Sequence, residues 1–163
     1  MSRCKVCSCD LGEVPMCFGS NSPAALMVEP EEYEKRVLEN ADQCIVDEEH
    51  YFIRGHIEIP VTDSNEVFIW SVWVSLSEQS FEHMSEHWDS KGREKYEPYF
   101  GWLSTKLSCY PETLHLKTSV QSQPLGGVPT IKVELTEHPL SQEQENGITM
   151  ERVHEIVHQV MQH

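Results

Sequence analysis

The sequence lacks the long apolar run that a membrane-spanning helix needs, and it is poor in basic residues. Its longest apolar-rich stretch, VFIWSVWVSL (67–76), has the length of a strand and is broken by serines. Only 12 lysines and arginines stand against 27 acidic residues, so the formal net charge is -15. This charge repels nucleic acid and anionic membranes. We therefore expect neither as a partner. Either a basic protein is the partner, or the acidity serves solubility alone.

Several familiar motifs are also missing. There is no phosphate-binding P-loop, no dinucleotide-binding fingerprint, no G-x-S-x-G nucleophile and no internal repeat. The opening residues MSRCKVCSCD contain no apolar segment typical of a secretory signal, which predicts a cytoplasmic protein. In that reducing compartment the 6 cysteines are better interpreted as thiols or metal ligands than as disulfides.

The composition fits one globular domain with a short cysteine-rich segment before it. Of the 163 residues, 39% are hydrophobic and 24% are charged, which are values typical of folded domains. Residues 1–24 are rich in Cys, Ser, Gly and Pro and are predicted to form a Cys-rich knuckle. Residues 25–163 are predicted to form a single α+β domain.

Hydrophobic periodicity predicts three helices and two hairpins within that domain. Alternating apolar residues indicate strands, and apolar residues spaced by three or four indicate helices. In chain order the expected elements are a helix at 30–41, strands at 51–61 and 67–76, a helix at 78–90, strands at 113–120 and 130–136, and a helix from Thr149. The strand at 67–76 is apolar on both faces, so it belongs in the middle of a sheet. The predicted fold class is α+β, with a mainly antiparallel sheet of about four strands (two hairpins) packed with about three helices.

The last helix contains the motif His154-Glu155-Ile156-Val157-His158, which has the H-E-x-x-H pattern of zinc peptidases. Histidines four residues apart share a helical face, and the glutamate can activate a metal-bound water. The helical projection places Val153, Ile156, Val157, Val160 and Met161 on the buried stripe, both histidines on its flank and Glu155 toward solvent. A catalytic zinc needs a third protein ligand, and only five residues follow His158. We therefore interpret the match to this motif as a coincidence, and a zinc-dependent hydrolase is the alternative interpretation.

The stronger metal-binding pattern lies at the other end, in CKVCSCDLGEVPMC. Cys4 and Cys7 form a C-x-x-C pair, which can hold a tetrahedral zinc from a tight turn. A structural zinc site takes four ligands, so Cys9 and Cys17 are predicted to complete it. Cys44, or a histidine from elsewhere in the fold, is the other source of the missing ligands, and free thiols on the N-terminal segment are the simpler interpretation.

Two further groups of side chains have both a structural and a functional interpretation. His83 and His87 are four residues apart and are expected on a solvated helix flank. The aromatic residues are expected in the core, although they could instead line a pocket. They are Trp70, Trp73, Trp88, Phe100, Trp102 and Tyr110.

The segments CKVC, DQCIVDEEHYFIRG, IWSVWVSLSEQSF, FGWLSTKLSCYPETLHLKT and EHPLSQEQENGITMERV together resemble the bacterial family called domain of unknown function 2199. The resemblance spans nearly the whole chain. It implies a bacterial, cytosolic, single-domain protein without established catalysis. Members of that family open with C-x-x-C-G-x-x-H, which implies zinc-ribbon-like ligation. Cys4 and Cys7 match this pattern and Cys44 matches a family cysteine, whereas Ser8 and Leu11 stand where the glycine and the histidine would be.

The sequence as a whole favours a non-enzymatic, acidic binding protein. Its concrete form is an immunity or antitoxin protein that neutralises a basic toxin, with a structural zinc at the knuckle. The net charge and the lack of a complete catalytic constellation support this hypothesis over the zinc-dependent hydrolase.

Overall fold

The computed structural model describes residues 15–161. Within this range the chain forms eight strands, five α-helices and two short 3-10 helices, the latter at Pro30–Glu32 and Arg93–Lys95. The strands are β1 (Cys17–Phe18), β2 (Val37–Glu39), β3 (Gln43–Val46), β4 (His50–Pro60), β5 (Val67–Leu76), β6 (Tyr99–Leu103), β7 (Lys117–Gln121) and β8 (Thr130–Val133). The helices are α1 (Ala24–Met27), α2 (Tyr33–Arg36), α3 (Glu78–Glu86), α4 (Pro139–Asn146) and α5 (Met150–Met161). None of these helices has the length and apolar character needed to cross a membrane.

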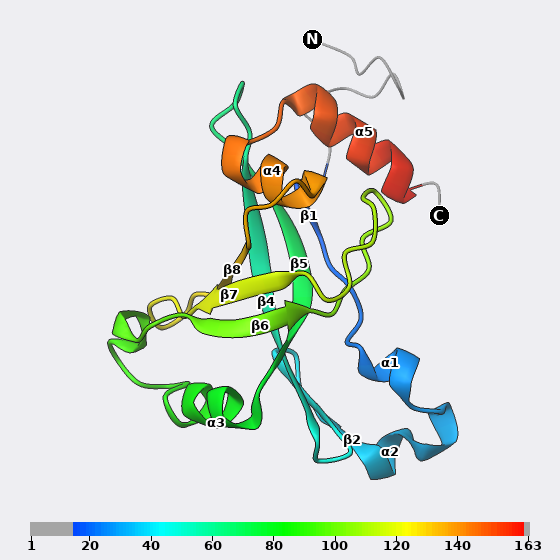
Figure 1. The fold of residues 1–163 in the computed structure, drawn as a ribbon, viewed down its shortest axis with the longest axis vertical. Helices are drawn as coiled ribbons and strands as arrows, with labels where there is room; N and C mark the ends of the chain where they lie inside the picture. The colour runs from blue at the N-terminus through cyan, green and yellow to red at the C-terminus, as the bar shows by residue number, and fades with distance from the viewer. Residues whose placement is uncertain (1–14, 162–163) are drawn as a thin grey trace.

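Five of the strands close into a barrel, in which β6 and β7 cross the long β4–β5 hairpin (Figure 1). Strands β4 to β8 follow one another as antiparallel neighbours, and β8 then pairs with β4 in parallel through Thr130 and His56. In an up-and-down series of five strands the first and last run the same way, so their pairing must be parallel. Strands β3 and β2 extend the sheet beyond β4, and β1 lies in parallel against β5.

This architecture corrects the predicted fold class. The sheet of about four mainly antiparallel strands with about three helices is wrong, because the described residues form a mixed barrel, three attached strands and five helices. Strand β6 was missed because Gly101 and Pro98 are poor strand formers, and β1 to β3 are too short to show a period.

The two long strands have the burial pattern that the sequence predicts. On β4 the side chains of Ile53, Ile57 and Ile59 have no exposed surface. On β5 the side chains on the same face as Val72 lie in the main core. Trp73, on the other face, lies in a second, smaller core. The prediction of a strand buried on both faces is therefore confirmed.

The second core includes residues of α1 and β2, which with α2 lie at the end of the molecule opposite α4 and α5 (Figure 1). It joins α1 and its flanks to the extension of the sheet. Its members are Ala24, Val28, Val37, Cys44, Val46, Phe52 and Trp73. Because Val37 pairs with Val46 on β3, the predicted helix over 30–41 ends at Arg36 and its last part is a strand.

Other local predictions are partly correct. The helices predicted at 78–90 and from Thr149 are present as α3 and α5, whereas the strand predicted at 113–120 begins only at Lys117. Ile131 and Val133 are buried as expected, but Leu135 is exposed because β8 ends at Val133. Of the predicted knuckle 1–24, the described part contains β1 on the barrel and Ala24 in the second core.

Candidate functional site

An open groove of about 510 Å³ lies between α1 and one side of the barrel. Leu26 and Met27 of α1 line one wall, and Trp102 and Leu103 of β6 line the other. The floor includes Phe52 of β4. The groove has the size of a small-ligand or side-chain pocket, and most of its lining residues are apolar.

The apolar surface of this groove is accessible and extends along β6. Leu26 is 87% exposed and Trp102 is 41% exposed. Phe100, two residues before Trp102 on β6, is also exposed, and the two rings meet edge to face with their centroids 5.0 Å apart. Grouped apolar and aromatic side chains on a surface are typical of sites that contact another molecule.

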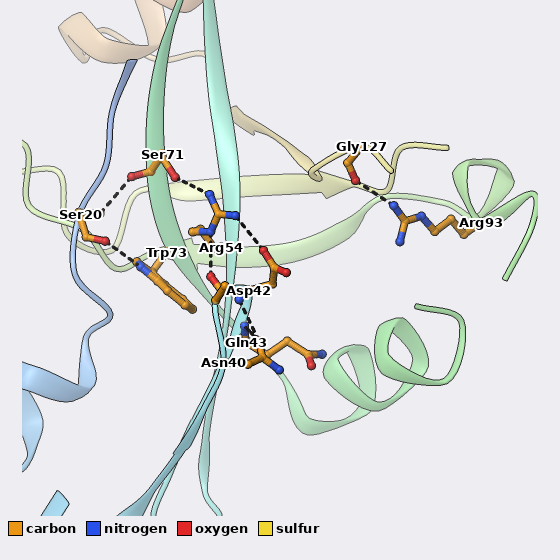
Figure 2. Close-up of polar contacts among 10 residues, drawn as sticks. Ser20, Asn40, Asp42, Gln43, Arg54, Ser71, Trp73, Arg93 and Gly127 are labelled. Atoms are coloured by element: carbon orange, nitrogen blue, oxygen red, sulfur yellow. Dashed lines mark hydrogen bonds and ion pairs between the residues drawn. The ribbon is translucent and has the colours of Figure 1, made fainter. Parts of the chain in front are cut away.

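The segment that leads into α1 is fixed to the outer face of β5 (Figure 2). The Ser20 hydroxyl donates to the Ser71 carbonyl over 3.0 Å, and the Trp73 indole N–H donates to the Ser20 carbonyl over 3.2 Å. Arg54 supports this contact from β4, because it donates to the Ser71 hydroxyl and to the Asp42 carboxylate. The α1 wall of the groove is therefore anchored to the barrel.

A second anchor holds the residues on both sides of α1. The Glu39 carboxylate on β2 accepts hydrogen bonds from the Tyr33 hydroxyl and, over 2.7 Å, from the Ser22 hydroxyl. Burial on its own would raise the pKa of Glu39, but hydrogen bonds from Tyr33, Ser22 and Cys44 outweigh it and lower the pKa below its ordinary value of 4.5.

Replacing this carboxylate is expected to weaken the anchor only while the carboxylate is ionised. Glu39→Gln should lower the free energy of unfolding at neutral pH by less than about 1 kcal/mol, because the cluster is partly exposed. A group whose pKa is lowered by folding stabilises the fold above its unfolded pKa and loses this effect as the pH falls through its folded pKa. In urea unfolding, the difference from wild type should shrink as the pH is lowered below 4.5. Glu134→Gln, at an exposed position, is the control; a difference that stays constant at acid pH would contradict the argument.

Two histidines border the groove from different elements. His50 begins β4, and His115 lies in the loop before β7 with a left-handed φ of 71°. Such a conformation is uncommon for histidine and is kept only where the surroundings impose it. Here the His115 N–H donates to the Leu103 carbonyl over 2.7 Å, and the buried Thr113 hydroxyl fixes the start of the same loop.

The groove was not predicted from the sequence. Of the aromatic residues with two interpretations, Trp70, Trp73 and Tyr110 are buried in the core, whereas Phe100 and Trp102 are exposed. The alternation Tyr99-Phe100-Gly101-Trp102-Leu103 was the available sign, since it places two aromatic rings on one face of a strand. The α1 wall had no sign in the sequence, because this helix is only 4 residues long.

Most of the predicted zinc ligands lie outside the described residues. Cys4, Cys7 and Cys9 fall before residue 15, and Cys17 is exposed on β1. Among residues 15–161 no group of three or more histidine, cysteine or acidic side chains is arranged to hold a metal ion. Zinc binding at the knuckle therefore stays a prediction.

The remaining two cysteines are packing residues. Burial raises the pKa of the Cys44 thiol to about 11, and burial also raises the pKa of Cys109, which packs against the main core. Cys44 has no exposed surface and lies in the second core beside Val46 and Trp73.

The H-E-x-x-H motif lies on α5, partly as predicted. Val153, Ile156 and Val157 are buried, while Glu155 is exposed and accepts a hydrogen bond from Arg152. His154 is not on a flank, however, because its side chain is fully buried, and Met161 is 69% exposed rather than buried. A catalytic zinc keeps one position open to water and substrate, and a fully enclosed His154 does not offer it such a position.

Comparison with known proteins gives one finding. The model of the family described as an uncharacterized protein conserved in bacteria (DUF2199) matches residues 3–148, which is most of the chain. No curated protein and no solved structure matches the sequence.

Proposed function

We propose that this chain, which belongs to the bacterial family domain of unknown function 2199, is a protein-binding domain that captures an apolar segment flanked by basic residues. The observation that carries this proposal is the exposed apolar groove between α1 and β6, with Leu26 and Trp102 on its opposite walls. Solvent-exposed apolar side chains lose water on binding, and tryptophan is among the residues that most often dominate the affinity of protein interfaces.

Exposed acidic residues are chain neighbours of two of the segments that line the groove. Glu48 and Glu49 are exposed and directly precede His50, and Glu112 is exposed beside the loop that carries Leu114. The whole chain has a net charge of -15, so lysines or arginines of the partner are attracted from a distance. When the partner's apolar residue is bound, these basic side chains pair with the exposed carboxylates. An apolar centre with a charged rim is the usual arrangement of a protein interface.

The same charge argues against single-stranded nucleic acid as the occupant. The exposed pair Phe100 and Trp102 would suit base stacking, but that mode of binding also needs a positively charged path for the phosphates. A chain with 27 acidic against 12 basic residues opposes phosphate binding. The concrete form that we propose is a cytoplasmic immunity or antitoxin protein that covers the basic surface of a toxin.

A synthetic peptide of leucine and lysine, with a leucine and glutamate peptide as its counterpart, tests the groove. We expect saturable binding of the lysine peptide, weakened by added salt, and a fluorescence change that disappears in Trp102→Phe. Leu26→Glu should reduce the affinity by about tenfold or more, since the loss of a central apolar contact costs at least about 1.4 kcal/mol. Leu135→Glu is the matched control, because Leu135 is 52% exposed and lies outside the groove. Equal effects of the two variants, or equal binding of the two peptides, would refute the proposal.

The toxin form of the proposal has a separate test. The product of the neighbouring gene is expected to co-purify with the wild-type chain and to be lost from Leu26→Glu. A neighbouring product that does not bind, together with a groove that binds the lysine peptide, would refute the toxin form and leave the groove proposal standing.

A further inference from the structure

A second cluster of chemistry-bearing side chains lies at α3, away from the groove. His83 and His87 are one helical turn apart, both are half-buried, and their ring centroids are 4.6 Å apart. Two imidazoles bound by their Nε2 atoms at about 2.1 Å from one metal, at roughly a right angle, have ring centres about 4.5 Å apart. The observed ring spacing is therefore short enough for both imidazoles to reach one ion.

A tyrosine hydroxyl occupies the other nitrogen of each ring. The Tyr99 hydroxyl lies 2.6 Å from Nδ1 of His83, and the Tyr96 hydroxyl lies 3.3 Å from Nδ1 of His87. Metal-binding histidines in proteins use this second hydrogen bond to fix the tautomer and the orientation of the ring. The Tyr99 hydroxyl can accept the Nδ1–H of His83, which leaves Nε2 as the ligand atom.

Ring packing also restricts the two histidines before any ion arrives. The Tyr96 ring lies 4.9 Å from that of His83 and 4.5 Å from that of His87, measured between centroids. Side chains already held in one orientation lose less conformational entropy when they bind a ligand. A solvated helix flank, as the sequence predicts for this pair, would leave both rings free to rotate.

We propose that His83 and His87 form a two-histidine site for a divalent transition-metal ion, with both Nε2 atoms as ligands and Tyr96 and Tyr99 as positioning residues. Imidazole nitrogens favour Ni²⁺, Cu²⁺ and Zn²⁺ over Mg²⁺ or Ca²⁺. No third histidine, cysteine or acidic side chain joins the pair within residues 15–161, so the other coordination positions go to water or to a donor from another molecule. The site is thus of the open kind and is independent of the groove.

Calorimetric titration with Ni²⁺ tests this site in the full chain carrying Cys4→Ser and Cys7→Ser. We expect one ion per chain, with saturable binding lost in His83→Ala and in His87→Ala. Tyr99→Phe should keep both ligands and weaken the affinity by about tenfold, as expected for a residue that orients a ligand. His158→Ala is the matched control, since His158 is also half-buried on a helix.

In the wild-type chain, paramagnetic Ni²⁺ should broaden the ring proton signals of Tyr96 and Tyr99 before those of Tyr110, and this readout needs no substitution. Loss of binding in His158→Ala, or binding abolished by the cysteine substitutions alone, would place the ion elsewhere and overturn the proposal. Broadening that affects Tyr110 equally would do the same.

Discussion

Gly101→Ala is expected to destabilise the barrel by more than about 3 kcal/mol, which is a large part of the stability of a domain of this size. A Cβ atom at Gly101 would lie 2.2 Å from Cγ1 of Val74 and 2.8 Å from the carbonyl oxygen of Ser75. Real Cβ atoms essentially never approach other atoms so closely. The methyl group of Val74 can rotate away only into a filled core, and the Ser75 carbonyl belongs to the β5 backbone that pairs with β6.

Gly19→Ala is the matched control, because a Cβ atom at Gly19 would meet no atom within 4 Å and its backbone is not in the left-handed region. Urea unfolding followed by far-ultraviolet circular dichroism gives the comparison. We expect Gly19→Ala to stay close to wild type and Gly101→Ala to unfold at much lower urea or to be recovered only as aggregate. Equal stability of the two variants would show that β5 and β6 do not cross as closely as the structure indicates.

Gly55 has the same role at the opposite seam of the barrel. A Cβ atom there would lie 2.6 Å from Cδ1 of Ile131 and 2.9 Å from the carbonyl oxygen of Pro129, which also accepts the N–H of His56 over 2.9 Å. Glycines in strand interiors mark sites where a sheet bends sharply or another backbone approaches. The two seams that close the barrel, β5 with β6 and β8 with β4, therefore each depend on a residue without a side chain.

These glycines also show why the sequence predicts the long elements but not the closure. The apolar alternation of β4, the two apolar faces of β5 and the helical spacing of Phe81 and Met84 are local patterns, and the structure confirms each of them. Gly101 instead weakens the pattern of β6, and the roles of Gly55 and Gly101 appear only when β8 and β5 lie against them. Sequence periodicity records which face of an element is buried, but it does not record which partner buries it.

The candidate site is hidden for the same reason. Its walls come from α1, β4, β5, β6 and the loop before β7, so no sequence window contains more than a part of it. Trp102 and Phe100 are visible as aromatic residues, but aromatic residues in a strand are usually core. Here both occupy the exposed positions of the alternating strand β6. The sequence also does not show that the pairs His154 with His158 and His83 with His87 differ in their surroundings. His154 is buried despite its motif, whereas His83 and His87 are held by tyrosines that come from beyond α3.

Arg93→Leu is expected to lower the free energy of unfolding by about 3 kcal/mol, although no carboxylate within residues 15–161 is hydrogen-bonded to Arg93. Its guanidinium donates to four main-chain carbonyls, those of Trp88 and Gln123 at 2.6 Å, Gly127 at 2.8 Å and Pro124 at 3.2 Å. Arg93 is 9% exposed and lies 5.7 Å from the centroid of the Trp88 ring. The contact with Gly127 is drawn in Figure 2. Each hydrogen bond to a charged group contributes about 1.5 to 3 kcal/mol. The loss in Arg93→Leu is smaller than the sum over the four bonds, because the carbonyls released at the loop regain water.

The shape of the guanidinium, and not only its charge, is required here. Arg93→Lys keeps the charge but offers a single ammonium group in place of a planar fork, so it cannot reach carbonyls on both the α3 connection and the 123–127 loop. It should therefore lose most of the stability that Arg93→Leu loses. Arg36→Leu is the control, because Arg36 pairs with the carboxylates of Asp47 and Glu32 at the surface, where ion pairs contribute little. Urea unfolding measures the global effect, and hydrogen exchange at the Gly127 N–H, which donates to the Pro124 carbonyl over 2.9 Å, measures the local one. If Arg93→Lys retained wild-type stability, the charge alone would hold this loop and the argument from fork geometry would be wrong.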